Sequence, residues 1–108
     1  MTSPVEPPRV AGPVWLDEDG LLHAGADWVA LSDTEWRLVA LMLDHSDHLV
    51  SRPQLVEAGW PGRTVQDTTL NVTMKRVRRR LAPLGLIVTT VRGRGFVLSA
   101  SPAASHQR

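Results

Sequence analysis

One stretch of the sequence, residues 70–81, constrains the fold more than any other. Its apolar residues recur at steps of four, three and four: Leu70, Met74, Val77 and Leu81. This spacing predicts the buried face of one α-helix. The same period places Val72, Lys75, Arg76 and Arg79 on the opposite face. A helix with a narrow apolar seam and a dense cationic outer face needs an acidic partner, and nucleic acid is the commonest one.

A second basic segment follows shortly after this helix. It reads Val91-Arg92-Gly93-Arg94-Gly95-Phe96, so that glycines alternate with two arginines. This pattern predicts a tight β-turn, and we expect Gly95 to hold a backbone angle that other residues avoid. The turn would give the basic helix a companion contact on the same partner.

The charged residues are divided unevenly between the two halves of the chain. Residues 1–50 carry nine acidic and two basic side chains, a balance of −7, whereas residues 51–108 carry two acidic and ten basic ones, a balance of +8. The formal net charge of +1 hides this division. Because almost no acidic residue is available nearby to pair with the arginines, we interpret the charge run as a binding surface. The alternative is a solvated helix face.

Composition excludes several classes of protein. With 108 residues, 43% of them hydrophobic, the chain suits one domain with a modest core. The absence of cysteine excludes disulfides, thiol catalysis and cysteine-ligated zinc. No apolar run reaches the ~20 residues of a membrane span, and the N-terminus lacks the apolar core of a signal peptide. The expected location is the cytoplasm, at the nucleoid.

Composition also suggests the domain boundaries. Residues 1–13 contain four prolines and are expected to form a flexible tail. Residues 99–108 are small and polar, and a second flexible tail is expected there. Residues 14–98 form the single predicted domain, which has no internal repeat.

The domain opens with short strand signals and then two clear helix starts. Residues 14–16 and 21–23 flank Asp17-Glu18-Asp19-Gly20, which is typical of a hairpin turn, and residues 28–31 suggest a third strand. Ser32-Asp33-Thr34-Glu35 and Ser51-Arg52-Pro53-Gln54 are capping boxes. They predict helices to about residue 43 and to about residue 58, where Gly59-Trp60-Pro61-Gly62 stops the second.

Asp67 or Thr68 is the expected cap of the third helix, which should run to Leu81 and end at Pro83 and Gly85. Residues 87–91 and 96–98 then predict a final hairpin. The predicted fold class is α+β. It is a winged helix-turn-helix with a short N-terminal antiparallel sheet, three helices and a C-terminal β-hairpin wing.

In this order, the motifs resemble the OmpR/PhoB-type winged-helix DNA-binding domain, the output module of many bacterial response regulators. The resemblance covers roughly residues 14–98 and rests on a few strings. They are Leu31-Ser32-Asp33-Thr34-Glu35, Leu49-Val50-Ser51-Arg52-Pro53-Gln54-Leu55, Trp60, Val77-Arg78-Arg79-Arg80-Leu81 and Thr90-Val91-Arg92-Gly93-Arg94-Gly95-Phe96. The last string, in the wing, is the most specific of them.

The resemblance implies a mode of DNA binding. The third helix would enter the major groove, and the wing would touch the adjacent minor groove or its phosphates. Val72, Thr73 and Arg76 would lie against base edges, with Arg78 and Arg92 near phosphate or the minor groove. The loop of residues 62–66 would be the one that contacts RNA polymerase.

The sequence departs from the family pattern in several places. Phe96 stands where tyrosine is usual, Asn71 where aspartate is frequent, and Thr73 where histidine is common. No receiver domain with its phosphorylated aspartate precedes the module in this sequence. The expected protein is therefore a regulator without a receiver domain.

Other residue patterns have competing interpretations. Four tryptophans, Trp15, Trp28, Trp36 and Trp60, could stack on single-stranded bases, but we expect them to pack in the core or at helix ends. His45 and His48 have helical spacing, but no third metal ligand stands out. Ser32 and Ser51 are helix caps, and Asp17 and Asp19 belong to a turn, so no enzyme is predicted.

The sequence therefore predicts a bacterial transcription regulator that binds double-stranded DNA, without cofactor, metal or membrane contact. The alternative is an interaction module that docks on RNA polymerase or another regulator. We expect a monomer in solution that binds DNA in tandem or as a dimer. The predicted DNA-binding residues are Thr69, Val72, Thr73, Lys75, Arg76, Arg78, Arg79, Arg80, Thr90, Arg92 and Arg94.

Overall fold

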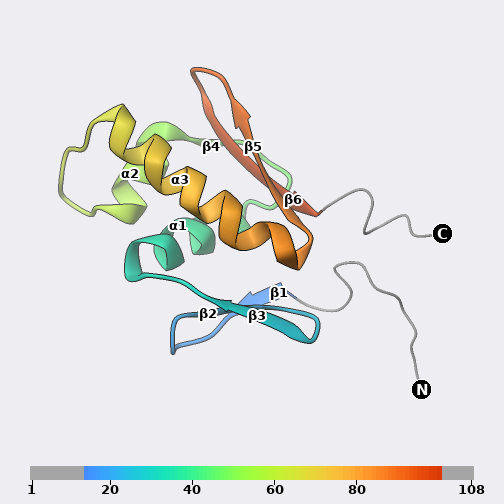
Figure 1. Cartoon of the computed structure of the whole chain (residues 1–108). Coiled ribbons are helices and arrows are strands. Elements are labelled where there is room, and N and C mark those ends of the chain that lie inside the picture. The colour runs from blue at the N-terminus through green and yellow to red at the C-terminus, as the bar shows by residue number, and fades with distance from the viewer. Residues whose placement is uncertain (1–13, 101–108) are drawn as a thin grey trace.

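Two antiparallel sheets flank a layer of helices in the computed structural model, which describes residues 14–100 (Figure 1). The chain order is β1 (Val14–Leu16), β2 (Leu21–Ala24), β3 (Asp27–Ala30), α1 (Asp33–Asp44), β4 (Val50–Ser51), α2 (Arg52–Gly59), α3 (Asp67–Leu81), the 3₁₀ turn η1 (Ala82–Leu84), β5 (Leu86–Val91) and β6 (Gly95–Ala100). This is the predicted α+β winged-helix fold.

The first sheet has the order β1-β2-β3 and lies on the opposite side of the helices from the second sheet (Figure 1). The predicted hairpin turn is confirmed, because the Asp17 carboxylate accepts the amides of Asp19 at 2.8 Å and Leu21 at 3.0 Å. The indole Nε1 of Trp36 donates to the Asp17 carbonyl at 3.0 Å. This hydrogen bond fixes the turn to α1.

Both predicted capping boxes are present. The Ser32 hydroxyl accepts the Glu35 amide at 3.2 Å while the Glu35 carboxylate accepts the Ser32 amide at 2.9 Å. Ser51 and Gln54 form the same pair of bonds at 3.2 and 2.9 Å. Each box satisfies amides that a helix start leaves unpaired, so the starts of α1 and α2 are set locally.

The predicted cap of α3 is wrong. Gln66 occupies the cap position, with an extended backbone (φ −76°, ψ 156°) and no side-chain bond to the helix. Asp67 is instead the first helical residue, where its negative charge suits the positive end of the helix dipole. At the other end, Pro83 lies in η1 and Gly85 terminates it in the left-handed conformation, as predicted.

The second sheet contains a strand that the sequence did not reveal. The order is β4-β6-β5, and Val50 and Ser51 pair with Phe96 and Gly95. A two-residue strand leaves no periodic signal, which is why no strand was predicted there. Strand β6 also continues to Ala100, so residues 99 and 100 belong to the domain and not to the predicted tail. The rest of that tail, and the N-terminal one, lie outside the described residues.

The close approach of β4 gives Gly95 a different role from the expected one. Its backbone angle is ordinary, but a Cβ built there would lie 2.0 Å from the Val50 carbonyl oxygen. Gly93 is the residue with the left-handed backbone (φ 72°). The two wing glycines therefore have separate roles. Gly95 is needed because there is no room for a Cβ, and Gly93 is needed because its backbone is left-handed.

The core lies where the three helices meet the inner faces of both sheets. Leu22, Leu38, Leu55, Leu70 and Leu81 are each fully buried. Trp60 packs against this core and Trp36 is half-buried, as expected. Among residues 14–100, no helix is both long and apolar enough to cross a membrane.

The expected packing of Trp15 and Trp28 is wrong. They are 46% and 60% exposed, on the face of the first sheet that points away from the core. In register, His23 lies between them, and its ring stacks on Trp15 with centroids 3.9 Å apart. Strand alternation explains the error, because Leu22 and Val29 point inward and leave the tryptophans outside.

Candidate nucleic-acid interface

Helix α3 separates an apolar inner face from a cationic outer one, as its sequence predicts. Leu70, Met74, Val77 and Leu81 are at most 1% exposed. On the outer face Lys75, Arg76 and Arg79 are exposed, and the Val72 side chain is 51% exposed beside them. The seam holds the helix on the core while four neighbouring side chains remain free to meet a ligand.

Two threonines of the predicted set lie at different depths. Thr69 is exposed, whereas Thr73 is only 9% exposed. The Thr73 hydroxyl donates to the Thr69 carbonyl at 2.9 Å. Thr73 therefore faces the protein, and its hydroxyl hydrogen is already bonded within its own helix. The structure brings Thr69 but not Thr73 to the outer surface.

Arg78 links α3 to the wing. Its Nε donates to the Val88 carbonyl at 2.9 Å and its Nη2 to the Thr90 hydroxyl at 2.8 Å. Both partners belong to β5. Arg78 thus sets the position of the wing relative to the helix, and Thr90 is exposed beside the same guanidinium.

Arg80 has an acidic partner that lies far away in sequence. Its Nε lies 3.0 Å from Oε1 of Glu35, whose side chain is only 4% exposed. The sequence-based assumption that almost no carboxylate could pair with the basic run is wrong at this position. The separation of 45 residues between the partners hides the pair from any local pattern.

The wing presents two arginines at its tip. Arg92 and Arg94 are both exposed, and the Arg94 amide donates to the Val91 carbonyl at 2.9 Å to close the turn. Gly93, between them, needs the left-handed conformation that closes such a tight turn. The backbone therefore fixes where both cations stand.

Arg52 is a site residue that the sequence reasoning missed. Its Nη2 donates to Oδ1 of Asn71 at 2.8 Å, its Nε lies 3.6 Å from Oδ1 of Asp67, and its guanidinium stands 5.6 Å from the centre of the Phe96 ring. Its amide also donates to the Arg94 carbonyl at 3.2 Å. Arg52 thus joins α2, α3 and the wing. A cation in the first turn of a helix opposes the dipole, and that anomaly was the available signal.

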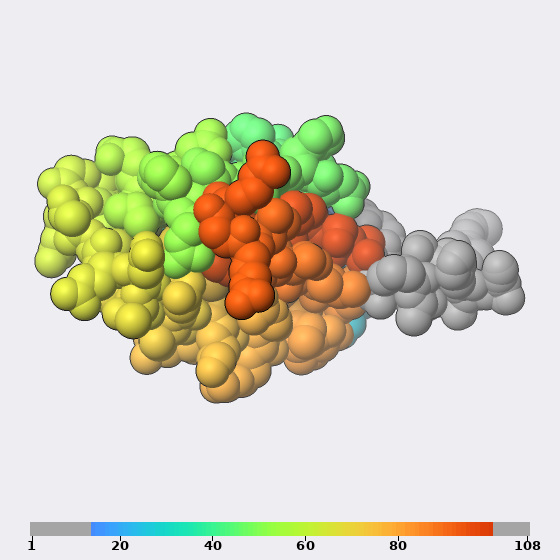
Figure 2. All heavy atoms as spheres, turned by 90° about the horizontal axis from the view of Figure 1, so that it is seen from above, coloured from blue at the N-terminus to red at the C-terminus, as the bar shows by residue number. Residues whose placement is uncertain are grey.

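These elements enclose a basic cleft between α3 and the wing. Its volume is about 540 Å³, and Arg52, Asp67, Asn71, Met74, Lys75, Arg78, Thr90, Arg92, Gly93 and Phe96 line it. Figure 2 looks onto this side of the molecule, with the wing projecting from the middle of the face and α3 running beside it. Four of the lining residues are cations and one is an acid, so the cleft suits an anionic ligand.

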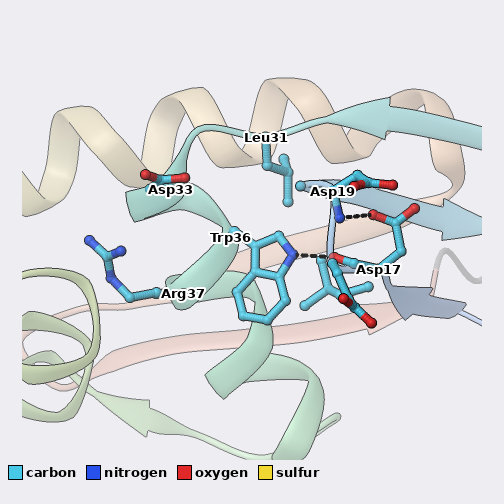
Figure 3. Close-up of a pocket in the computed structure, with 9 residues that line it drawn as sticks. Asp17, Asp19, Leu31, Asp33, Trp36 and Arg37 are labelled. Atoms are coloured by element: carbon cyan, nitrogen blue, oxygen red, sulfur yellow. Dashed lines mark hydrogen bonds between the residues drawn. The ribbon is translucent and has the colours of Figure 1, made fainter.

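A second hollow has the opposite character. Its volume is about 610 Å³, it lies between the β1–β2 turn and the start of α1, and its charged lining includes Asp17, Glu18, Asp19 and Asp33 (Figure 3). The one cation there, Arg37, donates to the Gly59 carbonyl at 3.0 Å. Within residues 14–100 no group of three or more histidine or carboxylate side chains could hold a metal ion.

The chain is similar in sequence and fold to known proteins. The family model described as "Transcriptional regulatory protein, C terminal" matches residues 25–98. The transcriptional regulatory protein YvcP of Bacillus subtilis is 35% identical over 78 residues, which are 66% of this chain and 33% of that protein. The phosphate regulon regulator PhoB of Escherichia coli is 34% identical over 79 residues, 70% of this chain and 34% of PhoB.

Solved structures agree with these sequence matches. The C-terminal domain of the nisin resistance regulator NsrR is 36% identical, with a TM-score of 0.70 over 82% of this chain and 93% of that one. The AdeR DNA-binding domain, 20% identical with a TM-score of 0.70 over 81% of this chain and 94% of that one, shows the shared fold. The chain spans about a third of the length of the curated relatives it matches. The protein belongs to the OmpR/PhoB-type family of winged-helix transcriptional regulatory domains.

Proposed function

We propose that this protein binds double-stranded DNA with sequence preference and thereby regulates transcription. One observation carries the proposal. Lys75 on the outer face of α3, Arg92 of the wing and Arg52 all border one cleft, and hydrogen bonds hold the helix and the wing in fixed relation. A rigid helix beside a basic hairpin suits a major groove and the backbone that borders it.

The proposed contacts divide into two kinds. Arg76 reads a guanine through its two-pronged guanidinium, and Val72 packs on a thymine methyl group. Thr69, Lys75, Arg79, Arg92 and Arg94 bind phosphates or the minor groove, which supplies affinity without sequence choice. Arg78 and Thr90 border the cleft and hold the wing. Thr73 is left out of this set because it is buried.

Relatives support the proposal. PhoB, at 34% identity, is a transcriptional regulatory protein. The AdeR domain was solved with an intercistronic region and the RstA domain of Klebsiella pneumoniae with the RstA box, so domains of this fold hold DNA. The basic cleft of this chain offers an anionic ligand such as DNA a suitable surface.

The proposal is tested by selecting bound sequences from a random duplex pool. Enrichment of one sequence class, bound with a specificity ratio of at least ~10³ over scrambled duplex at physiological salt, is the expected result. Selected and scrambled duplexes that bind equally would refute sequence-specific regulation by this domain.

A second candidate function, docking on another protein, has its own supporting observation. Trp15 and Trp28 are exposed on the face of the first sheet that points away from the core. Exposed aromatic groups of this size are typical of protein contacts.

The loop of residues 62–66 between α2 and α3 is a further candidate for contact with RNA polymerase. The variant Trp15→Ala/Trp28→Ala should bind duplex DNA normally, and a loss of transcription activation in a reconstituted reaction would support docking.

A further inference from the structure

A buried carboxylate stands directly beneath the basic face of α3. The Glu35 side chain is 4% exposed, and its Oε1 accepts the Ser32 amide at 2.9 Å and forms an ion pair with Arg80, whose Nε lies 3.0 Å away. The capping box needs only the oxygen and not the charge. A buried carboxylate is costly unless a cation meets it, and Arg80 is that cation.

One side of the Arg80 guanidinium contacts Glu35, and the other side faces solvent. Its side chain is 45% exposed, so the contact with Glu35 leaves much of the guanidinium in solvent. A guanidinium has three nitrogens with five N–H donors, and the ion pair with Glu35 is made on the side of Nε. Arg76, Arg79 and Arg80 together line a hollow of about 250 Å³ on the outer side of α3. No other residue lines it.

We propose that Glu35 is a positioning residue for DNA recognition, acting through Arg80. It holds the guanidinium so that its outer edge, with Arg79, forms a cradle for one phosphodiester group of the DNA, while Arg76 at the rim of the same hollow reaches a base. The inference rests on the proposed function and adds to it a residue that belongs to α1 and cannot reach DNA itself.

Charge explains why the arginines need this support. Arg76, Arg79 and Arg80 lie three and four residues apart on one helix face, where like charges repel. Glu35 offsets one of the three charges and fixes one of the three side chains. Without Glu35, the Arg80 side chain would be free to reach any nearby phosphate. The affinity for unrelated DNA would then rise, and the ratio of the affinities for selected and unrelated DNA would fall.

The test is Glu35→Gln, which keeps an oxygen for the Ser32 amide and removes the charge. Affinities for a selected duplex and a scrambled duplex are measured by fluorescence anisotropy over a range of salt. We expect the ratio of the two affinities to fall about fivefold and the log–log salt slope on scrambled DNA to steepen by about one contact, or roughly −0.9. An unchanged ratio and slope overturn the proposal.

Glu57→Gln is the matched control, because it removes the same charge from an exposed side chain on α2. It should leave the ratio unchanged. A fall in the ratio as large as that of Glu35→Gln would mean that net charge alone is responsible, which overturns the proposal.

A second pair of variants tests the route through Arg80. In an Arg80→Ala background, adding Glu35→Gln should no longer lower the ratio, and a further fall overturns the proposal. If Glu35→Gln does not fold, Arg80→Lys replaces it. This change keeps the charge but lacks the second N–H edge, so the ratio should again fall about fivefold, and an unchanged ratio counts against the cradle.

Failure of this inference differs from failure of the proposed function. A wild-type ratio near one refutes sequence-specific binding. A high wild-type ratio that is unaffected by Glu35→Gln refutes only the positioning role of Glu35.

Discussion

Arg76 combines exposure with freedom from internal partners. It lies on the outer face of α3, and among residues 14–100 its guanidinium makes no hydrogen bond or ion pair. By contrast, Arg78 and Arg80 are bound to β5 and α1. A side chain with all five donors available suits bidentate recognition of a guanine.

Replacing Arg76 by alanine should therefore cost about 1–3 kcal/mol on the best duplex and relax the preference at one base pair. Binding titrations against a panel of single-base variants of the selected duplex measure both effects. Arg79→Ala is the matched control, and it should weaken all duplexes by a similar factor. Unchanged affinity and preference in Arg76→Ala would show that the orientation of α3 on DNA differs from the proposal.

The two wing glycines give a prediction about stability. Gly95→Ala places a Cβ against the Val50 carbonyl and should cost about 3 kcal/mol of unfolding free energy, because backbone cannot move aside cheaply. Gly93→Ala has open space around its Cβ and should cost only about 1 kcal/mol for the left-handed angle. Urea unfolding of both variants measures the difference. Equal costs would contradict the role given to strand β4.

At the scale of elements, the sequence was informative wherever a signal is local. The capping boxes, the apolar seam of α3 and the Asp17 turn each lie within a few residues, and the structure has all three. Strand β4 was missed because two residues carry no period. The exposure of Trp15 and Trp28 was missed because three-residue and four-residue strands do not show which face is inward.

The β1–β2 turn should make stability depend on pH. The hydrogen bond from His23 at 2.7 Å, with the Leu21 and Asp19 amides, holds the pKa of Asp17 below its usual value of 3.8. A carboxyl with a lowered folded-state pKa stabilises the fold above its unfolded pKa, and this stabilisation is lost as the pH falls through the folded pKa.

Asp17→Asn should therefore be less stable than wild type at about pH 6, and the difference should shrink toward about pH 3. Urea unfolding at both pH values gives the comparison. Glu18→Gln removes a neighbouring exposed carboxylate and serves as the control. A difference between Asp17→Asn and wild type that does not change with pH would refute the role of the Asp17 charge.

The wing should contribute affinity more than sequence choice. Arg92 stands exposed at its tip, where phosphates or a narrow minor groove would meet it. Arg92→Ala is expected to weaken selected and scrambled duplexes by the same factor in anisotropy titrations. A loss confined to the selected duplex would instead identify Arg92 as a base reader.

At the scale of the whole molecule, the basic cleft lies between α3 and the wing, and the first sheet lies on the other side of the helices (Figure 1). The sequence predicted that the basic residues gather on the third helix and the hairpin after it, because the acidic residues precede them in the chain. It could not predict the long-range contacts that hold the basic residues in place. Arg52 contacts Asn71, 19 positions away, and Arg80 contacts Glu35, 45 positions away. Helix and strand periodicity gives no information about pairs so far apart in the sequence.

One domain of this size covers only a few base pairs, so we expect monomers to bind repeated half-sites side by side. The half-sites should lie about 10–11 base pairs apart, which places the α3 helices of both copies on one face of the duplex. Gel shifts on probes with one or two half-sites at varied spacing measure this. Tight binding to an isolated half-site, with no gain from a second at any spacing, would contradict the assembly.

The most direct test of duplex recognition is the salt dependence of binding to a selected and a scrambled duplex, measured side by side. If about five phosphates are neutralised per domain, both log–log slopes should be roughly −4 to −5, with the selected duplex bound more tightly at every salt concentration. Slopes near zero, or two duplexes bound equally throughout, would contradict recognition of DNA through α3 and the wing.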